Sequence, residues 1–346
     1  MAWTQLTDPI DQDVELLTYP EQLINQSKVL LKQCTDYHFW RADDSANQDL
    51  GIIACAQTGR YWSVLSVSTL GLSIYRDAFE TCDTMQIIAK VLGQEIAPTA
   101  VKSKGCMCGA APPPYEVQKL SASKGEQVVS DFVQDLIKGQ RVHKAGLVFQ
   151  QQPDEKEETI MAKQTESSKL IVFYKALGEL VNLQTHTGYN GDTGKFNAEV
   201  IYAKINEHEL LYHLVTKLPY KEKDDQQLER KRHIGNDNVI IVLREFESEQ
   251  FEPDDFITSH QIKVYLVFDV IEENQNDLLL KIKMYSRGVN QDYLKCKITE
   301  GWLMDEGMLE NINILITNAC LSAYTDPELN RRLNAKWKVL LEKAIQ

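Results

Sequence analysis

Two runs of β-branched and aromatic residues in the second half of the chain, NVIIVL (238–243) and IKVYLVFDVI (262–271), constrain the fold most strongly. Continuous apolar runs of this kind are typical of strands that a sheet buries on both faces, because a strand with one solvated face alternates apolar and polar residues. Segments with helical apolar spacing lie between these and other strand-like runs after residue 140. This alternation predicts an α/β structure with a largely buried sheet.

The pattern also predicts where the chain divides. Strands are expected at 142–150, 198–205, 209–217, 238–244, 262–271 and 278–285, and helices at 126–138, 167–177, 224–234, 305–322 and 327–344. Upstream, we expect helices at 22–33 and 82–92 and a three-stranded meander at 50–57, 61–69 and 71–79. The segment 97–125 holds four prolines with clustered Gly, Ala and Ser, which is typical of a linker. A length of 346 residues suits two domains, predicted as an α+β module at 1–140 and a second domain at 141–346 that includes the closing helices.

Charge and cysteine content exclude several classes of protein. Lys and Arg total 37 against 50 Asp and Glu, a net charge of −13, so neither a nucleic-acid partner nor a membrane surface is expected. No apolar run approaches the length of a membrane-spanning helix, and the acidic amino terminus lacks the pattern of a signal peptide. The seven cysteines have irregular spacing and are expected to be free thiols. The expected location is cytoplasmic, without membrane insertion.

Three near-matches to known motifs do not support a phosphate or metal site. GYNGDTGK (188–195) has five residues between its outer glycines and Phe after the lysine, whereas a phosphate-binding loop needs four and Ser or Thr. His208 and His213 are five residues apart, so a helix would point them in different directions, and their segment alternates like a strand. Cys106 and Cys108 have no second ligand pair nearby. No metal site is therefore predicted.

The most informative segment is KLPYKEKDDQQLERKRHIGND (217–237). Acidic residues at 224 and 225 and basic residues at 230–233 match the two ends of a helix dipole, and Gly235-Asn236 resembles a carboxyl-terminal cap. A purely structural interpretation, a capped helix, is therefore coherent. The carboxamide of Asn236 favours a functional interpretation instead, because it offers both donors and an acceptor at a cationic helix end. In an acidic chain this end is a candidate contact for an acidic partner surface.

The same segment resembles the signature of the Rap/Ran-GAP domain, most closely that of Rap GTPase-activating proteins, with tuberin and the Ral-directed GAPs as relatives. Further similarity to the family is found in HKAGLVFQQ (143–151), SSKLIVFYKALGELVNLQTHTGYNG (167–191), FEPDDFITSHQIKVYLVFDV (251–270), TNACLSAY (317–324) and DLGIIACAQTGRYWSVLSVST (49–69). The last of these is similar to the family's amino-terminal dimerisation module.

The resemblance implies a catalytic domain with a mixed central sheet flanked by helices, preceded by the smaller α+β dimerisation-type module. It implies a homodimer that stimulates GTP hydrolysis on a GTP-bound Rap-like or related Ras-family GTPase. GTP and Mg²⁺ would belong to that GTPase, with no cofactor of the chain's own. The alternative is a non-catalytic GTPase-binding or dimeric scaffold.

Individual roles follow from the resemblance as well. Asn236 matches the asparagine that the family inserts in trans to position the attacking water, without an arginine finger. His233, Arg232, Lys231 and Lys144 match GTPase-binding residues, although His233 could instead pack in its own domain and the two basic helix residues could be merely solvated. Gly235 is expected to let the helix end sharply, and Asp237 to orient the backbone or pair with a nearby base. The shortened 188–194 turn and the lack of a proline-rich loop near 290 leave the choice of GTPase open.

Overall fold

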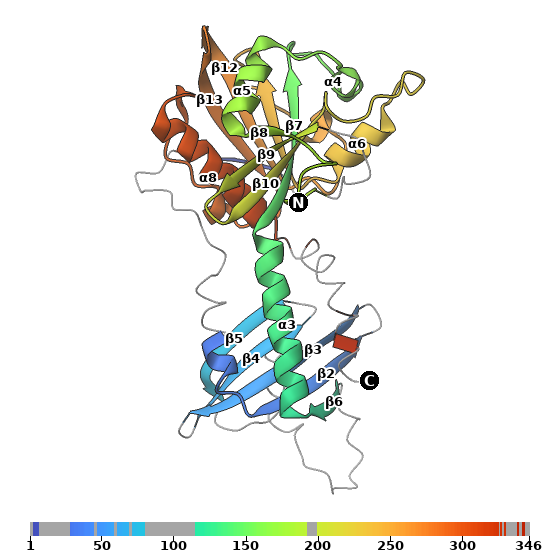
Figure 1. Ribbon diagram of the computed structural model, residues 1–346, viewed down its shortest axis with the longest axis vertical. Helices are drawn as coiled ribbons and strands as arrows, with labels where there is room; N and C mark the ends of the chain where they lie inside the picture. Colours follow the sequence, from blue (N-terminus) through green and yellow to red (C-terminus); the bar gives the residue numbers. More distant parts are fainter. Residues whose placement is uncertain are drawn as a thin grey trace, which may run out of the picture. The chain divides into compact units, whose positions relative to one another are not determined.

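The computed structural model describes residues 3–6, 28–44, 47–58, 61–68, 71–79, 115–191 and 199–324, together with 326, 329, 338 and 341–342. The chain divides into two compact units, one made of Thr18–Gly139 and Asn330–Gln346 and the other of Met1–Leu17 and Gln140–Leu329 (Figure 1). No helix in these described ranges has both the length and the apolar character needed to span a bilayer.

The two ends of the chain depart from the expected division at 140/141. The strand β1 (Thr4–Leu6) pairs with Met284–Ser286 of the larger unit, while Leu341 is buried in the core of the smaller unit. Each terminal segment therefore belongs to the unit that is farther away in sequence. The physical reason is that short segments gain stability from the edge or the apolar surface they cover, which local composition does not identify.

The smaller unit is a five-stranded antiparallel sheet in the order β5-β4-β3-β2-β6, with the long helix α3 packed against it. Its elements are β2 (Asp36–Asp44), β3 (Asn47–Thr58), β4 (Tyr61–Ser68), β5 (Gly71–Phe79), β6 (Tyr115–Leu120) and α3 (Ala122–Gln140). Phe39, Ile52 and Leu65 from the sheet and Val129 and Phe132 from α3 form its core. This arrangement confirms the predicted meander as β3, β4 and β5.

The expected linker at 97–125 is wrong over its last part. Residues 115–120 pair with β2 as a sheet strand, and α3 begins at Ala122. The strand is short and largely polar, with Val117 exposed and Leu120 buried, so its hydrogen-bonded partner rather than its composition determines its structure. The expected helix at 82–92, Cys106 and Cys108 lie outside the described residues, as does most of the closing helix at 327–344.

The larger unit is a nine-stranded mixed sheet in the order β1-β13-β12-β11-β7-β10-β9-β8, with β14 paired to β13. Its further strands are β7 (Val142–Gln150), β8 (Glu179–Asn182), β9 (Glu199–Ile205), β10 (His208–Leu214), β11 (Val239–Arg244), β12 (Val264–Asn274), β13 (Asp277–Ser286) and β14 (Glu300–Trp302). The four central strands β10, β7, β11 and β12 are parallel, and antiparallel strands continue the sheet on both sides. All six residues of β11 are buried, as its continuous apolar run predicts.

Helices flank this sheet, which confirms the predicted fold class. They are α4 (Glu157–Ala162), α5 (Ser168–Leu177), α6 (Leu228–Gly235), α7 (Pro253–Phe256) and α8 (Glu306–Ala323), with a 3₁₀ turn at Gln291–Leu294. Helices α5 and α8 touch each other and the sheet, whereas α4 and α6 pack against β7 (Figure 1). His208 and His213 lie on strand β10, as their alternating pattern predicts, and no group of three potential metal ligands occurs within the described residues.

Candidate functional site

Helix α6 carries the basic segment, and a tightly bonded loop precedes it. The helix begins at Leu228, four residues later than expected, because Asp224 caps it from a distance: its carboxylate accepts from the backbone N–H of Leu228 at 2.9 Å. Gln227 has a left-handed backbone (φ 47°), and its buried side chain bonds both backbone groups of Lys221. Side-chain bonds of this kind satisfy the loop backbone in a non-helical form, so residues 224–227 stay outside the helix.

Arg230 anchors α6 to the rest of the larger unit. Its side chain donates to the carbonyls of Leu218 (2.9 and 3.0 Å), Met161 (2.9 Å) and Lys163 (2.6 Å), and only 1% of the residue is exposed. Burial lowers the pKa of the guanidinium below its ordinary value, which lies so far above neutrality that the group stays charged. The sequence pattern grouped this residue with the basic helix end as a candidate partner contact, and that grouping is wrong for Arg230. Its spacing of four from the buried Ile234 is the signal that could have placed it on the inner face.

A buried polar network lies under the carboxyl end of α6. Asp237 is fully buried, and one carboxylate oxygen is 2.7 Å from Nδ1 of His213 on β10. The other oxygen is 3.8 Å from Nζ of Lys144 on β7. Asp237 thus pairs with two bases, the kind of role expected for it. Because β7 and β10 are paired in parallel, with His213 opposite Gly146, their side chains reach the same place.

Two glycines allow this close packing. At Gly146, two residues after Lys144, a Cβ would lie 2.7 Å from Ile240 and 3.3 Å from Ile234, so the absent side chain lets α6 approach the strand. At Gly191 the backbone is left-handed (φ 59°), and a Cβ would lie 2.7 Å from Leu211 and 3.1 Å from Nε2 of His213. The glycine turn around 188–191 therefore packs directly on the buried histidine.

His233 connects this network to the surface. It is half-buried, and its ring lies edge-on to that of His213 with centroids 5.8 Å apart. Burial, followed by the charges of His213 and Arg232, lowers the pKa of His233 below 6.5. The ring is therefore mainly neutral at pH 7. The geometry is compatible both with packing inside the domain and with contact to a partner.

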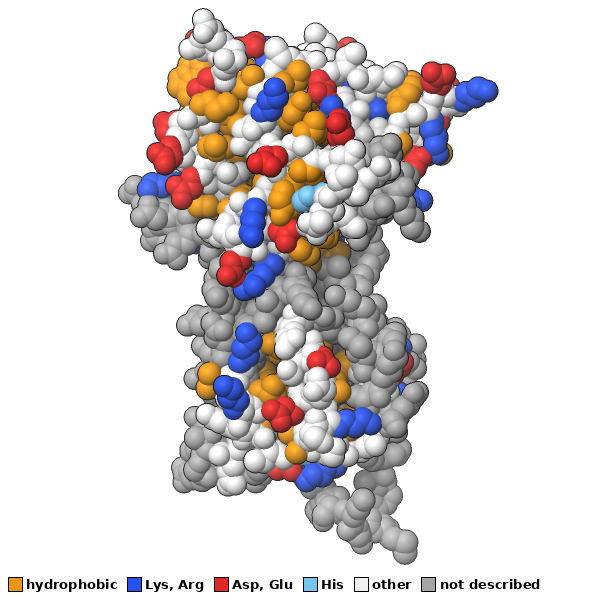
Figure 2. Space-filling model, viewed as in Figure 1, with side chains coloured by type: hydrophobic (Ala, Val, Ile, Leu, Met, Phe, Trp, Pro, Cys, Tyr) orange, Lys and Arg blue, Asp and Glu red, His pale blue; other side chains and the backbone are white. Residues whose placement is uncertain are grey.

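The remaining predicted residues differ in how far they face solvent. Asn236 and Arg232 are exposed. Lys231 is partly covered, because its ammonium lies 3.6 Å from Glu157 and 3.5 Å from Glu158 at the start of α4. Lys and Arg side chains project, among carboxylates, on the side of the larger unit where α6 lies (Figure 2).

The helix ends for a different reason from the one expected at Gly235. Asn236 has a right-handed backbone and donates its N–H to the carbonyl of His233, so no left-handed glycine terminates the helix. The carbonyl of Gly235 instead accepts from Ser259 Oγ at 2.5 Å. A Cβ at Gly235 would be 3.6 Å from Ser259, an ordinary contact. A neighbouring segment holds this end, which sequence reasoning did not identify.

The structure therefore brings most of the predicted residues to one place. Asn236, Arg232 and the outer edge of His233 lie at the end of α6, above Asp237 and Lys144, while Lys231 is drawn toward α4. Sequence reasoning missed His213, Arg230 and Ser259, whose roles depend on strands and loops distant in sequence. Arg232 and Asn236 are the exposed side chains at this helix end. Fold and site together define an α/β protein with a polar helix end that is open to solvent and supported by the buried network beneath it.

The comparison with known families identifies the group. The chain belongs to the Rap/ran-GAP family, whose sequence profile matches residues 160–338, more than half of the 346 residues. The match includes α6 with Asn236 and His213, whereas Lys144 on β7 precedes it.

Several curated proteins are similar over this region. GTPase-activating Rap/Ran-GAP domain-like protein 3 of Homo sapiens is 32% identical over 149 residues, which are 41% of this chain and 14% of that protein. Signal-induced proliferation-associated protein 1 of Homo sapiens is 31% identical over 204 residues, 58% of this chain and 18% of that protein. The chain thus spans less than a fifth of these relatives. Among solved structures, that of the TSC2 GAP domain matches with 22% identity and a TM-score of 0.43, over 54% of this chain and 97% of the other.

Proposed function

We propose that the chain is a GTPase-activating protein that stimulates GTP hydrolysis on a Rap-like small GTPase. The observation that supports this most is the exposed Asn236 at the end of α6, above the buried pair of Asp237 and His213. Relatives that carry the family domain include RapA guanosine triphosphatase-activating protein 1 of Dictyostelium discoideum, 28% identical over 149 residues. In this proposal GTP and Mg²⁺ are bound by the GTPase, and the chain supplies no cofactor of its own.

Asn236 would act on the attacking water. Hydrolysis is slow until that water is aligned with the γ-phosphate and the developing charge is stabilised. A carboxamide accepts a hydrogen bond from water through its oxygen and donates toward a phosphate oxygen through its nitrogen, which neither Asp nor Ala reproduces. The buried network and the carbonyl bonds of Arg230 hold the helix that carries it, so little ordering remains for the moment of reaction.

We assign none of the nearby cations as an arginine finger, and their surroundings separate those that support the domain from those that contact the GTPase. Arg230 is held inside the domain by carbonyls, and Lys231 pairs with the carboxylates of α4. Arg232 is the exposed cation of the helix end, and we assign it with His233 to contact with the GTPase. Lys144 supports the site through Asp237 and is partly exposed, so it could also reach the partner.

The test is single-turnover GTP hydrolysis by Rap, Rheb, Ral and Ras GTPases with the wild-type protein, Asn236→Ala and the control Asn274→Ala. We expect one GTPase to be stimulated, and we expect Asn236→Ala to lose roughly 10³-fold or more of that stimulation, the scale of other residues supplied in trans. Asn274 is exposed at the end of β12, so its variant should behave as wild type. Binding of Asn236→Ala to the GTPase loaded with a non-hydrolysable analogue should persist. Near-full stimulation by this variant would refute the role of Asn236, and binding without stimulation by the wild type would indicate a scaffold.

A further inference from the structure

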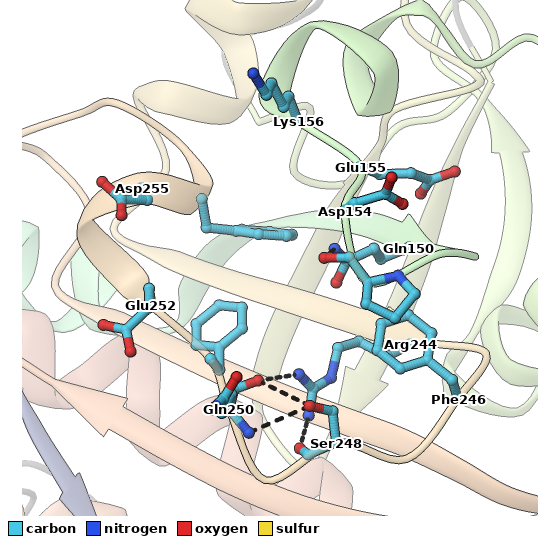
Figure 3. A pocket seen from close by; sticks show the side chains of 13 residues that line it. Gln150, Asp154, Glu155, Lys156, Arg244, Phe246, Ser248, Gln250, Glu252 and Asp255 are labelled. Atoms are coloured by element: carbon cyan, nitrogen blue, oxygen red, sulfur yellow. Dashed lines mark hydrogen bonds between the residues drawn. The ribbon is translucent and has the colours of Figure 1, made fainter.

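A concave surface, distinct from the end of α6, lies at the far ends of the strands that support this helix. Lys144 is near the start of β7 and Asn236 precedes β11, whereas Gln150 and Arg244 end these strands side by side in register. Six residues of strand place the two ends roughly 20 Å apart. At the carboxyl ends is a cavity of about 310 Å³ (Figure 3). In open α/β sheets this edge is where ligands commonly bind.

The apolar part of the cavity consists of three phenylalanines and Pro153. Phe246, Phe251 and Phe256 line it, and the rings of Phe251 and Phe256 have centroids 5.0 Å apart. Phe246 and Phe251 already flank one guanidinium, since that of Arg244 lies 5.4 and 5.8 Å from their ring centres. Arg244 is buried, and both carboxylate oxygens of Asp269 accept from it. Lys283 shares Asp269 at 3.0 Å and also lies 3.6 Å from Glu249, so both of these cations are paired with carboxylates.

The rim is acidic. Asp154, Glu155, Glu252 and Asp255 line the cavity, with the first two on one side and the last two on the opposite side (Figure 3). Glu155 pairs with Lys163 at 2.7 Å. The other three form no ion pair with any residue that the structure describes, and the exposed Lys156 is the one remaining cation of the lining.

Three carboxylates near the cavity form ion pairs, unlike the carboxylates of Glu252 and Asp255 in its lining. In the loop that follows β11, Glu247 and Glu249 pair with Lys281 and Asp254 pairs with Arg287. Glu252 and Asp255, the two acidic residues of this segment that line the cavity, form no ion pair with a described residue. A cation brought by a partner would complete the charge balance of this edge.

An acceptor in the cavity wall points to the same ligand. Gln150 is only 5% exposed, and its amide nitrogen donates to the carbonyl of Pro153 at 3.2 Å, which orients the side chain. Its carbonyl oxygen accepts no hydrogen bond from a described residue, although the side chain lines the cavity. An acceptor that is open to the cavity and unused by the described residues suits a ligand with N–H donors.

We propose that this cavity receives an arginine side chain from a basic peptide segment of a partner protein. The guanidinium would donate to Gln150 and Asp154 and lie against a phenyl face, with Glu252 and Asp255 contributing charge. A guanidinium suits the site better than an ammonium, because it is planar, stacks on aromatic rings and presents several donors at once. The site lies at the opposite end of the strands from Asn236 and does not depend on GTPase activation.

The experiment measures binding of a fluorescently labelled Gly-Ser-Arg-Ser-Gly peptide to the full chain at low salt. Two further peptides replace Arg by Lys or by citrulline, which keeps the shape without the charge. The test variant is Asp154→Asn/Glu252→Gln/Asp255→Asn, at exposed positions where folding should not suffer. The matched control is Glu179→Gln/Glu272→Gln/Glu310→Gln, which removes as many exposed charges elsewhere on the larger unit.

We expect the cavity variant and the citrulline peptide each to weaken binding at least about tenfold, and the control variant less than about twofold. Gln150→Leu, which removes the acceptor together with the bond to Pro153, should also weaken binding of the arginine peptide more than binding of the lysine peptide. Equal losses in the cavity and control variants would mean non-specific attraction and overturn the proposal. Equal binding of the arginine and citrulline peptides would do the same. The readout involves no GTP hydrolysis, so its failure leaves the proposed function untouched.

Discussion

Arg230 and Arg232 are two residues apart on one short helix, and their surroundings give them opposite uses. The first points inward and satisfies three backbone carbonyls, from Leu218, Met161 and Lys163. The second is exposed. Because the same side chain is a structural anchor in one position and a candidate partner contact in the other, substitutions at the two positions should affect different properties.

Arg230→Ala is expected to lower the free energy of unfolding by about 3 kcal/mol, since it leaves buried carbonyls without donors. Arg230→Lys should recover only part of this, because one ammonium cannot reproduce the forked geometry. Arg232→Ala should change stability by no more than about 0.5 kcal/mol and weaken GTPase binding instead. Urea unfolding followed by circular dichroism, with a GTPase-binding assay, measures both effects. A stable Arg230→Ala protein would contradict the anchoring role.

His233 should make stability depend on pH in a defined direction. Burial and the neighbouring cationic groups lower its pKa in the folded state below the ordinary 6.5, so below that pH the unfolded chain binds more protons than the folded one. The stabilisation is complete above pH 6.5 and is lost as the pH falls through the folded-state pKa. His233→Gln should therefore flatten the decline in unfolding free energy between about pH 6.5 and 5. An unchanged slope would show that the ring is not held in the neutral form.

At the scale of the element, α6 is held at both ends by neighbouring segments. Asp224 and Gln227 shape its start, while Ser259 and the network of Asp237 and His213 hold its carboxyl end. At the junction with β11, the carbonyl of Asn238 accepts from the backbone N–H groups of Lys263 and Val264. The helix has only eight residues, too few for its own propensity to stabilise it, so these contacts decide its position.

Glycine substitutions distinguish the elements that need glycine from those that do not. Gly191→Ala should destabilise the larger unit by about 1–3 kcal/mol, because it forces a side chain into a left-handed backbone against Leu211 and His213. Gly235→Ala should be tolerated and could add up to about 1 kcal/mol, since the position is helical and a Cβ has room. Thermal unfolding compares the two variants. Loss of GTPase stimulation in Gly235→Ala at full stability would restore the specific role first expected for this glycine.

At the scale of the whole molecule, the chain forms two units that exchange terminal segments. The five-stranded sheet and α3 of the smaller unit bury their own core, separate from that of the nine-stranded sheet. The larger unit holds both the helix end with Asn236 and the cavity at the opposite ends of the strands. The role of the smaller unit in self-association rests on resemblance, and we retain it as a proposal.

A homodimer through the smaller unit should give a sedimentation mass of about twice the 39.5 kDa of the chain at micromolar concentration. A substitution on the exposed side of β6, such as Val117→Asp, should then reduce the dimer fraction if this strand takes part, without changing the fold. Asn236→Ala, in the other unit, is the control and should sediment as wild type. A monomer across the concentration range would contradict the proposal.

The long strands and helices of the larger unit were predicted because their signals are local, whereas the short elements β1, β14, α4 and α7 were not. The run at 239–243 is apolar throughout, and β11 (Val239–Arg244), which contains it, is buried on both faces; the run at 142–150 forms β7 with the expected bounds. The exposed Asn236 was found because it stands in a recognisable segment. The strands at 36–44 and 115–120 were missed because neither has an alternation strong enough to identify a strand without its partner.

Contacts between segments that are distant in the sequence could not be predicted from the sequence alone. Local periodicity and cap residues determine that a helix and buried strands form, since they express the short-range preferences of the backbone and the burial of one face. They carry no information on which carbonyls a buried arginine will meet, or that Ser259 will hold Gly235. Those pairings are decided only when the sheet assembles and burial makes each unsatisfied polar group costly. The polar residues that support the site are therefore the part that the tertiary structure alone reveals.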